Sequence, residues 1–177
     1  MQNLIPIPLV NKELFDYPAE EQLYSFVTFR LHEEWYGIAV KDVHEVVRVP
    51  PLALLPSAPF SIVGLANVRG NLLPVIDPKR ILGIPSSPSS AQNRLVVLSA
   101  EGVDVGLLTD EVAEMVSVPA TQLEPPLATL NMSHLPYLES ICRWKDRLMG
   151  IFRVHKLMEF KASLPLAAKE ISHEKLE

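Results

Sequence analysis

Cysteine is almost absent from this chain, which has Cys142 and no other. One cysteine cannot form a disulfide within the chain, and the apolar neighbours of Cys142 indicate a packing role and not a nucleophile. The N-terminal residues also lack the basic region and the long apolar region of a secretory signal. Together these absences predict a cytoplasmic protein.

An excess of positive charge is missing as well, because 16 basic residues stand against 21 acidic ones. Such a chain has no broad positive field to hold phosphate backbones or anionic lipids, so we expect no nucleic acid partner. No apolar run reaches the roughly 18 residues that a spanning helix requires. The longest candidate, 62–76, is interrupted by Asn67, Arg69 and Asn71, so we expect no direct membrane insertion.

Motifs for catalysis and cofactor binding are missing too. The chain has no nucleophile elbow, phosphate-binding loop or dinucleotide-binding glycine fingerprint, and its histidines lack metal-ligand spacing. An enzyme using Asp77, Lys79 or His155 is the remaining alternative. Asp77 precedes Pro78, however, and this order better fits the N-cap of a short helix. We therefore expect no enzymatic activity, no metal and no cofactor.

Short apolar runs rich in Val, Ile, Phe and Tyr are what the chain does contain. Turn-forming clusters separate them, which is typical of antiparallel strands joined by hairpins and predicts an all-β fold with short helices. The runs cover residues 24–31, 35–40, 46–49, 62–68, 72–76, 94–99, 103–108, 116–118, 138–144 and 148–154. Helical pattern is brief and is confined to 78–82, 155–158 and the polar tail from Ala162 onward.

The distribution of these runs divides the chain into three parts. Residues 1–22 mix prolines with charges and predict an N-terminal extension, whereas 23–160 predict the folded domain. Residues 161–177 predict a polar C-terminal tail. Within the domain, 83–93 is rich in Pro and Ser and predicts a flexible surface link.

An internal repeat runs through the domain. Residues 37–50 align without gaps with 106–119, and six of the aligned positions are identical. Residues 72–82 align in the same way with 148–158, each a strand followed by a short helix. The two alignments join segments that lie nearly the same distance apart along the chain. They predict two similar β-units, linked by the Pro/Ser segment, that share one core because each alone is small.

The segment 62–77 contains the most specific local motif. It reads as two apolar strands joined by a tight turn, in which Gly70 allows a positive φ and Arg69 projects from the tip. By spacing alone, a solvated turn arginine explains it as well as a binding residue does.

This segment resembles the Gly-hydrophobic-x-Asn-hydrophobic-Arg-Gly turn of the CheW-like chemotaxis coupling family, and the resemblance extends over 24–160. It implies two five-stranded SH3-like β-barrel subdomains that share a hydrophobic core. It also implies a non-catalytic scaffold that binds the regulatory domain of a CheA-type histidine kinase and the signalling tip of a methyl-accepting chemoreceptor, and so works at membrane receptor arrays.

The resemblance also implies which residues bind partners. Arg69 and Gly64 match positions needed for coupling, and Glu45 matches the acidic residue that pairs with the arginine. Apolar positions near the groove between the subdomains would receive a receptor helix. A role in the barrel core is the alternative for these apolar residues. The partner-binding prediction comprises Val43, Glu45, Gly64, Val68, Arg69, Val112 and Met115.

Two departures from the family pattern leave the partners open. Val68 stands where leucine is usual, and Pro78 stands where an aliphatic residue is usual. The motif and the extension resemble coupling proteins of type IV pilus (twitching) systems somewhat more than flagellar ones. A related adaptor that carries a receiver domain is not expected, since only the short tail follows Phe160. An interaction module with a different partner remains an alternative.

Overall fold

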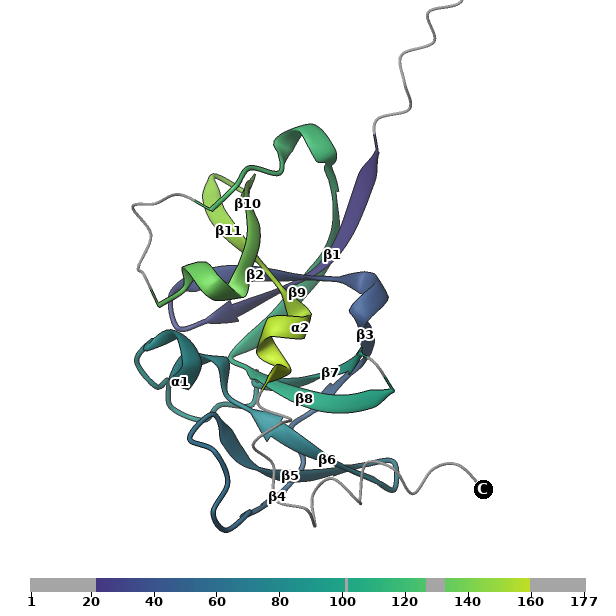
Figure 1. The fold of residues 1–177 in the computed structure, drawn as a ribbon, viewed down its shortest axis with the longest axis vertical. Helices are drawn as coiled ribbons and strands as arrows, with labels where there is room; N and C mark the ends of the chain where they lie inside the picture. Colours follow the sequence, from purple (N-terminus) through teal and green to yellow (C-terminus); the bar gives the residue numbers. More distant parts are fainter. Residues whose placement is uncertain (1–21, 101, 127–132, 160–177) are drawn as a thin grey trace, which may run out of the picture.

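Two β-sheets lie one above the other in the computed structural model, which describes residues 22–100, 102–126 and 133–159 (Figure 1). The predicted tail 161–177, its helix, and the extension up to residue 21 lie outside the described residues. The all-β prediction is confirmed, with helix confined to short segments.

The first sheet, called sheet A here, has five strands in the order β10-β11-β2-β1-β9. Its strands are β1 (Leu23–Leu31), β2 (Glu34–Ala39), β9 (Glu111–Pro119), β10 (Leu138–Trp144) and β11 (Arg147–Phe152). Antiparallel pairs dominate, and β11 runs parallel to β2. The strand count agrees with the predicted five.

The second sheet, sheet B, has six strands in the order β3-β7-β8-β6-β5-β4. Its strands are β3 (Val43–Arg48), β4 (Leu52–Ala53), β5 (Ile62–Val68), β6 (Asn71–Ile76), β7 (Arg94–Ala100) and β8 (Val103–Thr109). The sixth strand, β4, is a two-residue addition that pairs with β5 and was too short to be predicted.

The sequence repeat is visible in the pairing, but its units are not the two sheets. The first unit supplies β1 and β2 to sheet A and then crosses to sheet B at η1 (Val40–Asp42). The second unit supplies β7 and β8 to sheet B and crosses back at Asp110. Parallel pairs β2–β11 and β8–β6 join the units in equivalent places. Each sheet therefore contains strands from both units.

A hydrophobic cluster between the sheets is the shared core that the family resemblance implied. Sheet A contributes Phe29 and Phe152, whose rings stack with centroids 5.9 Å apart. Sheet B contributes Ile76 and Leu107, which are fully buried. Two smaller clusters lie within the individual sheets. Each fully buried large apolar side chain stabilises the fold by about 1.5–3 kcal/mol, so the cluster holds the sheets together.

Both predicted helices in the described residues are present. They are α1 (Pro78–Leu82) and α2 (Val154–Leu157), each following the last strand of its unit. Asp77 caps α1, because its Oδ1 accepts the backbone N–H of Lys79 at 3.0 Å. The helix ends at Gly83, whose φ of 70° is left-handed. Asp77 thus has the capping role predicted for it.

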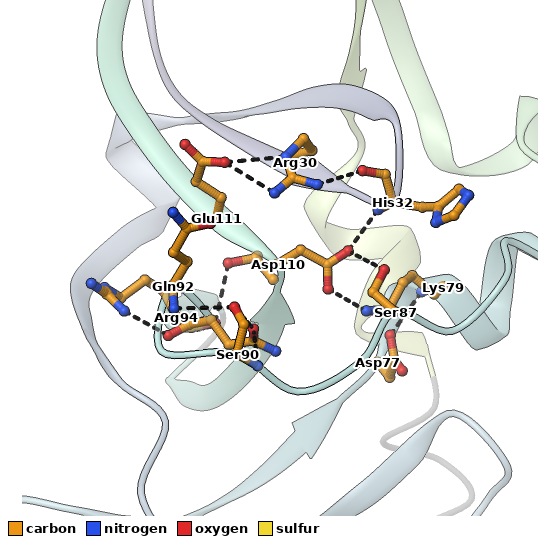
Figure 2. A network of polar contacts seen from close by, with 12 residues as sticks. Arg30, His32, Asp77, Lys79, Ser87, Ser90, Gln92, Arg94, Asp110 and Glu111 are labelled. Carbon is orange, nitrogen blue, oxygen red and sulfur yellow. Dashed lines mark hydrogen bonds and ion pairs between the residues drawn. The ribbon is translucent and has the colours of Figure 1, made fainter.

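A buried polar network joins the crossover between β8 and β9 to α1 and to the Pro/Ser segment (Figure 2). The carboxylate of Asp110 accepts from Lys79 Nζ at 2.5 Å, from the backbone N–H of His32 at 2.6 Å and from Ser87 Oγ at 2.7 Å. Both charged side chains are at most 5% exposed. The Pro/Ser segment is therefore anchored through Ser87, in contrast to the flexible link that its composition predicted.

The pKa values of the two buried carboxylates in this region are shifted in opposite directions. Burial by itself would raise the pKa of Asp110, but the hydrogen bonds from Lys79, His32 and Ser87 outweigh it and hold the pKa below its usual value. Burial also raises the pKa of Asp77, and there the nearby cations do not fully offset it. Asp110 therefore stays ionised at neutral pH and needs its cation.

We expect Lys79→Met to lower the free energy of unfolding by about 3–5 kcal/mol, because it leaves the Asp110 carboxylate buried without a counter-ion. Urea denaturation at pH 7 measures the change. Lys156→Met is the matched control, since Lys156 pairs with Glu159 at the surface and exposed pairs contribute about 0–1 kcal/mol. Equal losses in the two variants would contradict a special role for the buried pair.

The loss of stability caused by Lys79→Met should depend on pH. The pKa of Asp110 is lower in the folded than in the unfolded state, so its contribution to stability is present above the usual value of 3.8 and is lost as the pH falls through the folded pKa. The stability difference between wild type and Lys79→Met should therefore narrow on acidification from pH 7 to below 3.8. A difference that stays constant over this range would show that Lys79 acts by packing alone.

Candidate partner-binding site

Arg69 lies at the tip of the β5–β6 hairpin. Val68 pairs with Asn71, so Arg69 and Gly70 form a two-residue turn with φ values of 52° and 89°. Positive φ at both positions is the geometry of a type I′ turn. The backbone N–H of Gly70 also donates to Asn67 Oδ1 at 2.9 Å. The predicted tight turn is present and presents the Arg69 side chain, which is 77% exposed.

Glu45, on a strand distant in sequence, forms an ion pair with Arg69. Its Oε2 lies 3.0 Å from Arg69 Nε, and its side chain is only 19% exposed. Glu45 sits on β3 at one edge of sheet B, whereas the arginine comes from the hairpin at the other side. The ion pair that the family resemblance implied therefore forms, and its Glu45 Oε2 atom is buried and accepts no hydrogen bond among the described residues.

Gly64 lies inside sheet B and not at its surface. A Cβ at this position would approach the backbone oxygen of Ala53 to 2.6 Å, because β4 passes close to β5 there. Real Cβ atoms do not approach so closely, so either the strand pair or the added side chain must move. The backbone φ of 156° adds to the constraint. Because Gly64 has no side chain, β4 can pair with β5 at this short distance.

The predicted apolar residues occupy different environments. Val68 is buried at 6% exposure in the sheet B cluster, so it supports the turn from below. Val43 and Val112 begin β3 and β9 and are partly buried against the shared core. Met115 is 68% exposed on β9. The structure therefore brings Glu45 and Arg69 into contact, and it leaves Met115 open to solvent.

Two exposed apolar side chains next to the predicted residues were missed. Val46 follows Glu45 on β3, and Leu72 lies on β6 just after the Arg69 turn. Alternation along each strand would have placed both on the outer side, because Val47 and Leu73 point inward. Both are candidates for partner contact.

Chemical reactivity has little support in the described part of the chain. Burial raises the pKa of Cys142, which leaves its thiol protonated and inert at neutral pH. Among the described residues no group of three or more His, Cys, Asp and Glu side chains is placed to hold a metal ion. The helices described here are also too short and polar for any of them to cross a membrane.

Comparison with known proteins identifies the family. Residues 25–162 match the CheW-like domain. The chain belongs to the CheW-like domain family. It is 27% identical to chemotaxis protein CheW of Treponema pallidum, over 84% of this chain and 90% of that protein. It is 29% identical to protein PilI of Pseudomonas aeruginosa, over 85% of each.

A solved structure shows the same fold. The crystal structure of the scaffolding protein TtCheW from Thermoanaerobacter tengcongensis superposes with a TM-score of 0.71 at 32% identity, covering 82% of this chain and 94% of that one. The resemblance inferred from the Arg-Gly turn is therefore confirmed at the level of the family and of the fold. The identities of 27% and 29% do not separate the CheW relative from the PilI relative.

We expect Gly64→Val to lower the free energy of unfolding by about 1–3 kcal/mol, because the added side chain collides with the Ala53 backbone. Gly83→Val is a useful contrast, since no atom lies within 4 Å of its Cβ position and only its left-handed backbone is strained. Thermal denaturation of both variants measures the effect. A Gly64→Val protein as stable as wild type would show that β4 does not need this close approach.

Proposed function

We propose that this chain is a non-catalytic scaffold that couples a chemoreceptor to a CheA-type histidine kinase in a chemotaxis-like signalling complex. Family membership supports the scaffold role, and the match to CheW and PilI relatives covers most of the chain. The observation that carries the proposal is the exposed Arg69, which lies at the tip of a tight turn and pairs with Glu45.

The Arg69–Glu45 pair fits recognition better than stability. An ion pair with one partner 77% exposed contributes about 0–1 kcal/mol to folding, since solvent screens it. An exposed guanidinium, by contrast, presents several donors in a planar arrangement to a carboxylate or carbonyl of a partner. Exposed Leu72 follows the turn and adds apolar area, whereas Val46 lies on the side of β3 opposite Glu45. This part of sheet B is the proposed kinase-binding surface.

A coupling protein needs a second surface for the receptor. Val43 and Val112 lie where the chain crosses between the sheets, and Met115 is exposed on β9. A flexible methionine adapts to the apolar side of a helix, so these residues suit the signalling tip of a receptor. Binding through such small contacts is expected to be of micromolar strength, about 8 kcal/mol, with membrane receptor arrays supplying multivalency.

A type IV pilus chemosensory pathway is the second candidate for the output. The similarity to PilI, 29% over 85% of each chain, supports it to the same degree as the similarity to CheW supports the first candidate. The physical role is the same in both pathways, since each requires a scaffold with two partner surfaces. The identity of the receptor and kinase therefore distinguishes the candidates, and cognate partners from the same genome are the appropriate probes.

We expect Arg69→Ala and Glu45→Ala each to weaken binding to the regulatory domain of the cognate CheA-type kinase about tenfold, because the partner loses a fixed donor. Isothermal calorimetry measures the affinity, and thermal denaturation should show an unchanged fold. Lys156→Ala serves as control, because it removes another exposed, ion-paired cation. Binding by Arg69→Ala equal to wild type would remove Arg69 from the interface, and absence of wild-type binding would overturn the proposed function.

A further inference from the structure

The internal repeat holds in the strand register as well as in the sequence. Phe26 pairs with Ala39 between β1 and β2, and Leu95 pairs with Leu108 between β7 and β8. Each residue of the second pair lies 69 positions after its counterpart, the same offset that separates residues 37 and 106 in the sequence alignment. The pairs β1–β9 and β7–β3 follow the same correspondence. Residues of the first unit therefore have structural counterparts in the second.

A groove lies at the equivalent end of each sheet. The groove at the end of sheet A, called groove A here, has a volume of about 790 Å³. The groove at the end of sheet B, called groove B, has a volume of about 800 Å³. Equivalent residues line both grooves. With the groove A residue first, they are Tyr24 and Asn93, Ala39 and Leu108, Ala120 and Pro51, Arg153 and Asp77, and His155 and Lys79.

The Pro/Ser segment that leads into β7 forms part of groove B. Ser86, Ser87, Ser89 and Ser90 of this segment line the groove. Ser87 is the anchor, because its hydroxyl donates to the Asp110 carboxylate at 2.7 Å (Figure 2). In the second unit, the chain just before the first strand therefore lies in the groove of its own sheet and is held there by a polar contact.

The counterpart of this segment in the first unit is the extension before β1. The described chain begins at Gln22, whose backbone carbonyl accepts the N–H of Ala120 at 2.8 Å. Ala120 and Tyr24 both line groove A, so the extension joins the domain at the rim of this groove. By the offset of the repeat, residues 17–21 correspond to residues 86–90.

The charges at equivalent positions of the two grooves are reversed. Asp110 anchors Ser87 at the end of sheet B, and Asp77 lines groove B. The residues at the corresponding positions of the first unit are Lys41 and Arg153, which line groove A. In the described part of the chain no carboxylate forms an ion pair with either cation, including the carboxylates that line the same groove. Groove A thus has two cations available to an acidic segment.

The extension carries the complementary charge. Glu20 and Glu21 correspond to two of the serines that line groove B. A serine hydroxyl donates to a carboxylate in the second unit, and with the charges reversed a carboxylate of the extension accepts from Lys41 or Arg153. Tyr17 corresponds to a third serine of groove B and brings an aromatic ring to the apolar walls of groove A.

We infer that residues 17–21 dock in groove A of the same chain, as the Pro/Ser segment does in groove B. The carboxylates of Glu20 and Glu21 accept hydrogen bonds from the two groove cations, and the Tyr17 ring packs on the apolar walls. Because the segment is tethered at the rim, its effective concentration is on the order of millimolar, so weak contacts suffice. The extension is then an intramolecular strap that closes this end of sheet A to other molecules.

Hydrogen exchange followed by mass spectrometry on the full-length protein tests the docking. The amides of residues 17–21 should exchange at least tenfold more slowly than the intrinsic rates of the same sequence. Glu20→Lys/Glu21→Lys should return them to the intrinsic rates, because like charges then meet in the groove. Adding Lys41→Glu/Arg153→Glu to this variant exchanges all four charges and should restore the protection.

Glu13→Lys/Asp16→Lys is the matched control. It makes the same change of charge in the same extension but outside the docking residues, so the protection of 17–21 should stay as in the wild type. Slow exchange of the β1 and β2 amides in the same experiment shows that each variant is folded. The substitutions at residues 20 and 21 lie outside the described domain, so their effect on 17–21 is separate from any loss of the fold.

Three results would overturn the inference. The first is exchange of residues 17–21 at the intrinsic rates in the wild-type protein. The second is protection that survives in Glu20→Lys/Glu21→Lys, because these carboxylates would then not hold the segment. The third is a folded protein with all four charges exchanged in which the protection stays absent. No kinase or receptor enters the experiment, so each of these results leaves the proposed function untouched.

Discussion

The hydrophobic cluster between the sheets is the contact on which the rest of the structure depends. Each sheet takes strands from both halves of the chain, so neither sheet is complete until both halves have folded. Side chains such as Phe29 and Leu107 are fully buried between the sheets, and only packing of the two sheets removes them from water. Folding is therefore coupled across the molecule.

The buried pair of Lys79 and Asp110 completes this arrangement at the crossover between β8 and β9. The Asp110 carboxylate accepts the backbone N–H of His32, which lies in the turn between β1 and β2, and so ties this turn to the crossover. Its negative charge requires Lys79 from α1, so the helix of the first unit is tied to the crossover of the second. The corresponding position at the other crossover is Lys41, so the repeat does not duplicate this charge.

The exposed ion pairs have the opposite energetic character. Solvent screens Glu45–Arg69 and Glu114–Lys145, so neither contributes much to folding. Both nevertheless involve a cation at the tip of a two-residue turn with consecutive positive φ values. This contrast is why we assign stability to the buried pair and propose recognition for Arg69.

The sequence by itself determined the strand content, the α1 cap at Asp77, the Arg69 turn and the family, because each depends on local spacing that a single strand or turn enforces. It also contained both repeat alignments, which predict two similar β-units. Only the tertiary structure decided which strands share a sheet, that Val68 is buried while Met115 is exposed, and that Ser87 anchors the Pro/Ser segment. These features depend on contacts between residues far apart in the chain, and local pattern carries no record of such contacts.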